Sequence, residues 1–414
     1  MFDRRGKCVM PSMRSRGTRA AWTILTASAL TVGVSGCGSD ETASSPPPRA
    51  PAVDIAQLDT GNFPTQPRDF GKPVSLEHAR LVEAQRLGNH LPLPSATDPI
   101  FVYNDGIWVN AFIDAKPLSA IMATERFSEA APDFIGGFVT TAGSERHNEG
   151  IDLLNAALLF PSEQSAQRAA AELERVDFEY TNKNQRVEIP GYPKAHAHWQ
   201  PEGDQSIGSW YAVGRVVIYT WVYDYKLTYV NRRDLSGLQG LVEKNLDVVI
   251  PAIEKFQPTP PDKLMDIDVD PEGVLGRTLP GTGSEGSKNP AGVYDGLAAV
   301  HFSVNMSELK QVVDENGVDK FAYDGSQLYR AKDEASAAAV SARLTELSRK
   351  YRTADSPRNL PQARCIEYIG REMMAFRFYC SVSHGRYAAY IWSSQLLDAH
   401  QRISAQYTLL VNAE

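Results

Sequence analysis

The sequence predicts an α+β protein of two similar domains, each an antiparallel sheet with helices packed mainly on one face, as in ferredoxin-like sandwiches. An eight-residue frame occurs twice, as GRVVIYTW at 214–221 and GRYAAYIW at 385–392, with Gly, Arg, Tyr and Trp at matching places. Each copy lies directly before the last helical pattern of its half. Both halves give the element order β-α-β-α-β-β-β-α, so we predict an internal duplication.

The first half begins its pattern with an apolar strand and ends on a long helix. The expected elements are a strand over 106–113, a helix over 117–127, a strand over 152–160, a helix over 162–176, two or three short strands, the framed strand and a helix over 234–256. Ser162 is a suitable N-cap for its helix. Pro251 removes a backbone donor from the last helix and predicts a kink there.

The second half repeats this order with shorter elements. The expected elements are a strand over 296–304, a helix over 307–317, a strand over 326–331, a helix over 333–351, strands over 363–370 and 374–383, the framed strand and a helix over 395–411. Ser307 at the start and Gly317 at the end fit the preferences of helix termini. The matching order in two halves is the basis for predicting two related domains.

Composition sets the expected domain boundaries. Residues 257–290 are rich in Pro, Gly and Asp and have little apolar periodicity, which is typical of a linker. We therefore expect an N-terminal α+β domain over 54–256 and a C-terminal α+β domain over 291–414. Residues 37–53 are rich in Ser, Ala and Pro and predict an extended tether.

The N-terminus has the pattern of an export signal. Basic residues precede a short apolar stretch over 20–34, which ends in Val34-Ser35-Gly36-Cys37, the pattern of a bacterial lipobox. We expect a signal peptide over 1–36 and diacylation, including palmitate, of Cys37. The protein would then be anchored by lipid at the extracytoplasmic face of the cell membrane.

The charge balance excludes one class of partner. Residues 1–36 carry six basic residues and one acidic residue, so their removal changes the formal net charge from −8 to −13. An acidic chain has no electrostatic attraction to nucleic acid, and we expect no nucleic-acid partner.

Two cysteines remain in the body of the chain. Cys365 and Cys380 form an even pair in an oxidising compartment, and a disulfide is the expected state. The alternative is a metal pair, for which the neighbouring sequence offers no third Cys or His at ligand spacing.

Motif searches give no catalytic residue, no cofactor and no metal site. GTGSEG at 281–286 fits a dinucleotide fingerprint, but no strand precedes it and no helix follows. DIDVDPEG at 266–273 resembles a calcium loop but has Pro where the loop needs Gly. Ser307-Glu-Leu-Lys310 lacks the partner motif of serine enzymes that bind penicillin. His196 and His198 share a strand face, but two ligands do not make a zinc site.

The repeated frame supplies the candidate binding residues. They are Arg215, Tyr219, Trp221, Arg386, Tyr390 and Trp392. Within each copy they share one face of an extended strand, and Tyr223 and Tyr225 continue the first set. Aromatic rows stack on sugars, lipids or peptides, and Arg binds anions. The alternative is structural: the aromatic side chains cover the core, and each Arg caps the preceding turn.

Several stretches carry a resemblance to a known family. VDIAQLDTGNFPTQPRDFG at 53–71, LVEAQRLGNHL at 81–91 and SAQYTLLVNA at 404–413 resemble a family of uncharacterised actinobacterial lipoproteins, mycobacterial or nocardial in type. Its members contain a domain of unknown function with an N-terminal and a C-terminal part. The resemblance implies membrane-anchored proteins exposed at the surface, and it supplies no catalytic or ligand-binding residue.

These observations favour a non-catalytic lipoprotein of the cell envelope that binds a glycan, a lipid or a protein through its two domains. The alternative is an envelope hydrolase or metal-dependent enzyme whose site is built from dispersed residues; it predicts a deep pocket with convergent polar groups. A third hypothesis is a purely structural or antigenic surface protein.

Overall fold

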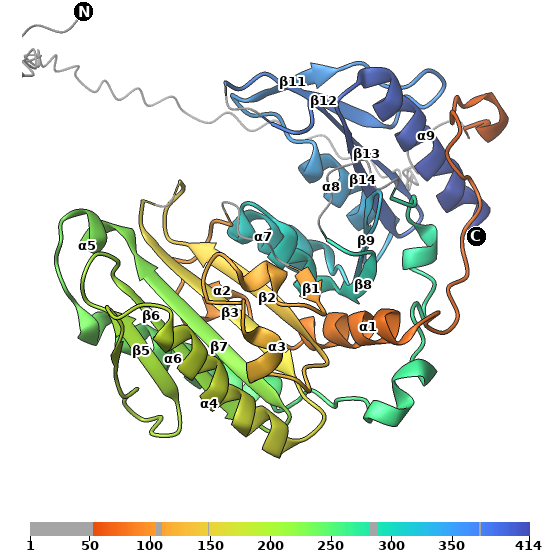
Figure 1. The fold of residues 1–414 in the computed structure, drawn as a ribbon. Coiled ribbons are helices and arrows are strands. Elements are labelled where there is room, and N and C mark those ends of the chain that lie inside the picture. Colours follow the sequence, from red (N-terminus) through yellow and green to blue (C-terminus); the bar gives the residue numbers. More distant parts are fainter. Residues whose placement is uncertain (1–52, 105–109, 148, 282–288, 372–373) are drawn as a thin grey trace, which may run out of the picture. The chain divides into compact units, whose positions relative to one another are not determined.

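Two seven-stranded antiparallel sheets form the body of the protein (Figure 1). The computed structural model describes residues 53–104, 110–147, 149–281, 289–371 and 374–414. The expected signal peptide and Cys37 lie outside the described residues, as do nearly all of the expected tether and part of the expected strand over 106–113. Residues 52–414 form one compact unit.

The two sheets have the same topology. The first has the order β1 (Asn110–Phe112), β2 (Gly136–Gly143), β3 (Ile151–Leu159), β7 (Val216–Asp224), β6 (Ser206–Val213), β5 (His196–Gln200) and β4 (Gln185–Arg186). The second has the order β8 (Gly292–Asp295), β9 (Lys320–Tyr323), β10 (Gln327–Arg330), β14 (Tyr387–Ser393), β13 (Phe378–His384), β12 (Arg364–Tyr368) and β11 (Tyr351–Ala354). In chain order both sheets run first, second, third, seventh, sixth, fifth, fourth. The α+β class with two similar domains is confirmed.

A constant sequence offset supports the duplication. Gly385 follows Gly214 by 171 positions (385 − 214), and both adopt left-handed backbone, with φ of 50° and 52°. The same offset relates Ser162 to Asp333, and each caps the helix that follows it. Because a hairpin turn and a helix cap recur at one spacing, the repeated frame reflects repeated local structure.

Helices cover both faces of each sheet. On the first sheet α4 (Glu163–Glu179) packs on one face, and α1 (Leu76–Gly88) with α6 (Leu235–Ile253) on the other. On the second sheet α8 (Glu334–Leu344), next to α7 (Met306–Asn316), packs opposite α9 (Leu396–Asn412). The helices are therefore divided between the faces, where the sequence led us to expect them mainly on one. The reason is that β7 is apolar on both sides: Val217 and Tyr219 face α4, whereas Ile218 and Val222 face α6.

Short elements complete the chain. They are α2 (Pro94–Thr97), α3 (Phe127–Ala130), α5 (Tyr225–Tyr229) and the 3-10 turns Ile55–Gln57, Lys116–Leu118, Pro261–Asp266, Leu275–Arg277 and Gly296–Phe302. None of the described helices is both long and apolar enough to cross a membrane.

Three expected elements differ from the structure. The expected helix over 117–127 is a loop between two short turns, because its backbone bonds elsewhere: Ala123 N–H donates to Asp177, and Ile121 C=O accepts from Tyr219. The expected strand over 296–304 is a 3-10 turn. The expected helix over 333–351 ends at Leu344, and residues 351–354 form an edge strand instead.

The two halves share one apolar core. Phe138 of β2 packs against the rings of Tyr294, His301 and Phe302 from the second half. Thr140 Oγ1 lies 2.8 Å from His301 Nδ1. These residues belong to a continuous buried region that draws on both sheets.

Segments expected at the domain margins also pack in the body. Between residues 257 and 281, expected as part of a linker, several apolar side chains are buried; they are Leu264, Val269, Val274, Leu275 and Leu279. Near the N-terminus, Asn412 Nδ2 donates to the carbonyl of Thr65, and Arg68 pairs with Asp324. Residues 54–70, expected in the N-terminal domain, therefore lie against the second half.

Candidate functional site

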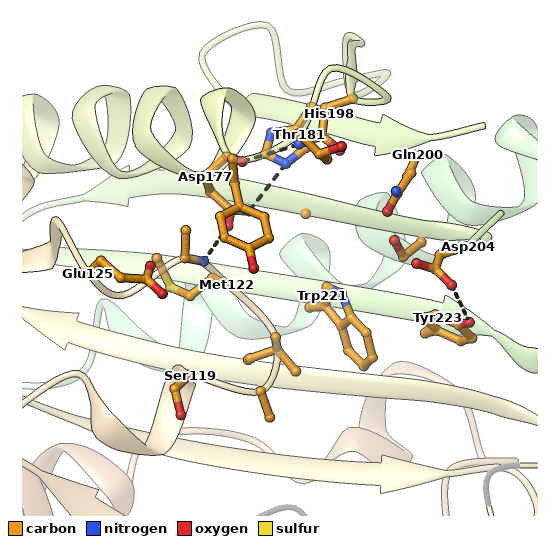
Figure 2. A pocket seen from close by; sticks show the side chains of 17 residues that line it. Ser119, Met122, Glu125, Asp177, Thr181, His198, Gln200, Asp204, Trp221 and Tyr223 are labelled. Carbon is orange, nitrogen blue, oxygen red and sulfur yellow. Dashed lines mark hydrogen bonds and ion pairs between the residues drawn. The ribbon is translucent and has the colours of Figure 1, made fainter. Parts of the chain in front are cut away.

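The first half contains a cavity of about 330 Å³ on the face of its sheet that α4 covers (Figure 2). It lies where the C-terminal end of α4, the loop 119–125 and strands β5 to β7 meet. The lining residues are Ser119, Ala120, Ile121, Met122, Ala123, Glu125, Asp177, Tyr180, Thr181, Asn184, His198, Gln200, Asp204, Ser206, Gly208, Trp221 and Tyr223. The loop reaches this position because Ala123 N–H and Ile121 C=O bond to side chains of α4 and β7.

Aromatic rings from the framed strand form part of the wall. Trp221 and Tyr223 project from the same face of β7, with ring centroids 5.5 Å apart. Tyr223 donates its hydroxyl to Asp204 Oδ1 at 2.9 Å, which fixes the ring (Figure 2). Burial raises the pKa of Tyr223; a bond with Thr228 acts against it and the bond to Asp204 adds to it, and the pKa remains raised, so the phenol stays neutral. Half-buried rings of this kind offer apolar faces to a ligand.

His198 lies between two carboxylates at the inner end of the cavity. Its Nε2 is 3.2 Å from Asp177 Oδ2 and its Nδ1 is 3.2 Å from Glu174 Oε1. Burial by itself would lower the pKa of the imidazole, but the bonds to Asp177 and Glu174 outweigh it and the pKa is raised. The ring stacks on Trp210 with centroids 5.3 Å apart. Carboxylate oxygens accept and do not donate, so this geometry needs a proton on both ring nitrogens, which favours the imidazolium and fixes the orientation of the ring.

The cavity combines aromatic faces with acceptor groups. Three carboxylates line it, from Glu125, Asp177 and Asp204, and no Lys or Arg is among the described lining residues. Within the described part of the chain, no group of three or more His, Cys, Asp and Glu side chains is arranged to hold a metal ion. The arrangement suits non-covalent binding of a small polar ligand.

The arginines of the repeated frame bind backbone carbonyls. Arg215 Nε donates to Phe160 C=O at 2.9 Å, and Arg386 Nε donates to Ala331 C=O at 2.8 Å. In both copies the arginine and the carbonyl that it binds are 55 positions apart in the sequence, so the two arginines make equivalent hydrogen bonds. Each ties the framed strand to the end of the third strand of its sheet. Neither arginine lines the cavity, and Arg386 also forms an ion pair with Asp319. These contacts are structural, and anion binding by the two arginines stays a prediction.

The aromatic candidates divide into core and cavity residues. Tyr219 is fully buried and donates to Ile121 C=O at 2.9 Å, and Trp392 is 7% exposed. Tyr390 is half-buried and stacks on Tyr379. Of the six candidate binding residues, the structure brings only Trp221 to the cavity. The two framed strands lie in different sheets and do not form one composite site.

The same position in the second half is filled by side chains. Gly208 pairs with Trp221 across the strands, whereas Tyr379 pairs with Trp392, so Tyr379 is the counterpart of Gly208. Tyr379 stacks on Tyr390 with centroids 5.9 Å apart and planes 14° apart. By the same pairing, Ile366 is the counterpart of His198. The first copy thus has glycine and a polar imidazole where the second has a phenol ring and an alkyl chain.

Sequence reasoning missed most of the polar residues of this site. His198 was noted only beside His196, which is exposed and does not line the cavity. Glu174 and Asp177 lie near the C-terminal end of α4, where the helix dipole disfavours acids. That misplaced pair was the available signal for a cationic partner, and the partner is His198.

The disulfide predicted from the sequence is confirmed. Cys365 and Cys380 face each other across β12 and β13, with Sγ atoms 1.98 Å apart. The counterparts in the first sheet are Ala197 and Ser209. The crosslink is therefore a property of the second copy alone.

Comparison with known proteins identifies a family and little else. The model described as "Domain of unknown function (DUF7373) N-terminal" matches residues 70–269, and the model of its C-terminal domain matches residues 274–413. Among curated proteins nothing matches. One similar solved structure is the "Crystal structure of the extracellular domain of PknH from Mycobacterium tuberculosis", with 14% identity, a TM-score of 0.29, and coverage of 45% of this chain and 100% of that chain. That likeness is too weak to inform the fold or the ligand. The two matched models follow one another along most of the chain, which therefore belongs to the DUF7373 family.

Proposed function

We propose that the protein is a non-catalytic lipoprotein of the actinobacterial cell envelope that binds a small ligand in the cavity at Trp221. In this proposal Cys37 carries the lipid, the body lies at the extracytoplasmic face of the membrane, and the N-terminal half recognises the ligand. The second half supplies the shared core and the disulfide.

The observation that carries this proposal is the difference between the two copies. A duplicated fold keeps its core residues for stability, and the face under α8 is packed with rings in the second copy. The first copy has Gly208 in place of Tyr379. The Trp210 indole fills part of the space over this glycine, and a cavity of about 330 Å³ that Gly208 lines remains beside it. This volume falls in the range of about 300–1,000 Å³ that is typical of small-ligand sites.

Binding of envelope glycans and lipid headgroups by the purified mature chain tests the proposal. We expect a ligand that changes the fluorescence of Trp221 and raises the unfolding temperature. Trp221→Ala should abolish the ligand-induced rise in unfolding temperature, because it removes the largest aromatic surface of the cavity. Tyr211→Ala is the matched control, since Tyr211 is a half-buried ring on the opposite face of neighbouring β6. Equal responses in the two variants would count against the cavity.

Anchoring is tested separately in cells. Wild-type protein should incorporate a labelled palmitate analogue and sediment with membranes, whereas Cys37→Ser should do neither. A wild-type chain that carries no lipid would refute this half of the proposal and leave ligand binding untouched.

An envelope hydrolase is the second candidate, favoured by the convergence of Asp177, Glu174 and His198. Its difficulty is that both imidazole nitrogens are bonded to carboxylates, which leaves no nitrogen to accept a proton from a nucleophile. We expect no turnover of envelope esters or glycans. Turnover that disappears in Asp177→Asn would establish the enzyme instead.

A further inference from the structure

We infer that the ligand of the Trp221 cavity is a sugar, or a sugar-like polyol, that carries a positively charged amine. This rests on the proposed function, because it names the class of ligand for the same cavity. Charge, aromatic surface and hydrogen-bonding capacity of the wall lead to it independently.

The charge of the wall excludes anionic ligands. Glu125, Asp177 and Asp204 contribute three negative charges, and the imidazolium of His198 contributes one positive charge. Asp177 is compensated by His198 and by the Ala123 N–H at 2.6 Å. Glu125 has no hydrogen-bond or ion-pair partner among the described residues, and Asp204 bonds only the neutral hydroxyl of Tyr223. The carboxylates of Glu125 and Asp204 therefore lack a cationic partner, and a protonated amine on the ligand would provide one.

The aromatic wall fits the same group. Trp221 and Tyr223 are half-buried, and Figure 2 shows Asp204 beside Tyr223, with Glu125 at the other side of the cavity. A ring face attracts a cation through its quadrupole, and it also packs against the C–H face of a sugar ring. A carboxylate next to an aromatic face strengthens the first effect.

The remaining wall is suited to hydroxyl groups. Within the described residues, the side chains of Gln200 and Ser206 have no protein hydrogen-bond partner. Both can donate and accept, which matches a hydroxyl. A simple alkylamine would form no hydrogen bonds with Gln200 and Ser206. An amine-bearing sugar can pair with the carboxylates, pack on the aromatic rings and bond to these two side chains at once.

Three sugars that share a ring separate the possibilities. Glucosamine, glucose and glucuronic acid differ in charge at mildly acidic pH, being cationic, neutral and anionic. We expect glucosamine to bind about fivefold more tightly than glucose, as expected for one partly exposed ion pair. Glucuronic acid should bind least. Titration calorimetry of the mature chain, with Trp221 fluorescence in parallel, measures all three.

Charge-neutralising variants test the source of the preference. The double variant Glu125→Gln, Asp204→Asn neutralises both of these carboxylates, keeps an acceptor for Tyr223 and should reduce the affinity for glucosamine to that for glucose. Asp247→Asn is the matched control, because Asp247 also accepts from a tyrosine hydroxyl, that of Tyr192, but does not line the cavity. Thermal unfolding of both variants checks that each remains folded.

The outcomes distinguish this inference from the function on which it rests. If glucose or glucuronic acid binds as tightly as glucosamine, or if the double variant Glu125→Gln, Asp204→Asn keeps the preference, the ligand class is wrong and the binding function stands. If none of the three sugars perturbs Trp221, the ligand class is wrong; if no envelope glycan or lipid headgroup perturbs it either, the binding function is refuted as well.

Discussion

At the scale of single residues, two buried histidines have opposite electrostatics. His198 is held charged by two acids, whereas His301 is fully buried between Leu91 C=O at 3.0 Å and Thr140 Oγ1 at 2.8 Å. Burial lowers the pKa of His301 to about 4, although its bond to the Leu91 carbonyl acts in the other direction. The neutral ring donates from one nitrogen and accepts at the other, which satisfies both bonds.

The pKa of His301 predicts an acid-sensitive interface. The unfolded chain binds a proton at His301 below pH of about 6.5, and the folded chain binds it only near pH 4, so stability falls as the pH decreases through this window. The full effect is about 3 kcal/mol. Urea unfolding at several pH values measures how the free energy of unfolding depends on pH. In His301→Gln the decrease between about pH 6.5 and pH 4 that is due to this histidine should be absent. His196→Gln, an exposed control, should keep it; an unchanged slope in His301→Gln would contradict the assignment.

The two tryptophans of the repeated frame should respond differently to truncation. Trp392 is 7% exposed and packs on Tyr323 and Phe376, so Trp392→Ala should cost about 3–5 kcal/mol of unfolding free energy. Trp221 is half-buried at the cavity, and Trp221→Ala should cost clearly less. Urea denaturation compares them directly. A larger loss for Trp221→Ala would place it in the core and weaken its role in binding.

At the scale of elements, the disulfide is a local addition to one sheet. Cys365 and Cys380 are 15 residues apart, and closing such a loop stabilises by about 3 kcal/mol in the chain-entropy model. The double variant Cys365→Ala, Cys380→Ser places in the second sheet the pair found in the first. We expect it to lose about this amount and to become insensitive to reductant. If reductant does not change the free energy of unfolding of the wild-type chain, the disulfide does not contribute to stability.

Elements with a strong apolar pattern were predictable, and those that depend on tertiary bonds were not. The strand at 152–160, the helix at 162–176 and both framed strands were placed correctly because their periodicity is clear. The sequence does not indicate strand β2, because GGFVTTAG contains three glycines, which have low strand propensity, and shows no apolar alternation, although every residue is buried.

The site was predictable only in part for a related reason. Trp221 could be found from strand alternation alone. His198 of β5, Asp177 of α4 and Asp204 of the turn between β5 and β6 line one cavity only after these elements pack together, and no local sequence spacing predicts this.

At the scale of the molecule, the shared core predicts cooperative unfolding. Phe138 contacts three rings of the second half, and the core is continuous across both sheets. Trp221 and Trp392 should therefore report one urea transition with the same midpoint. For each of the variants Trp221→Phe and Trp392→Phe, the midpoint of the urea transition is measured by tryptophan fluorescence and compared with the midpoint from far-UV circular dichroism. Two separated midpoints would indicate independently stable halves.

The central claim is that one copy of the duplicated fold binds a ligand and the other is filled. Indole resonances of the mature chain in a proton–nitrogen NMR spectrum test it, with Trp221 and Trp392 assigned from their Phe variants. On titration with glucosamine, and separately with glucose, the account predicts that the Trp221 resonance moves and saturates while that of Trp392 stays in place. A shift at Trp392 without one at Trp221, or no shift at either with both sugars, would contradict it.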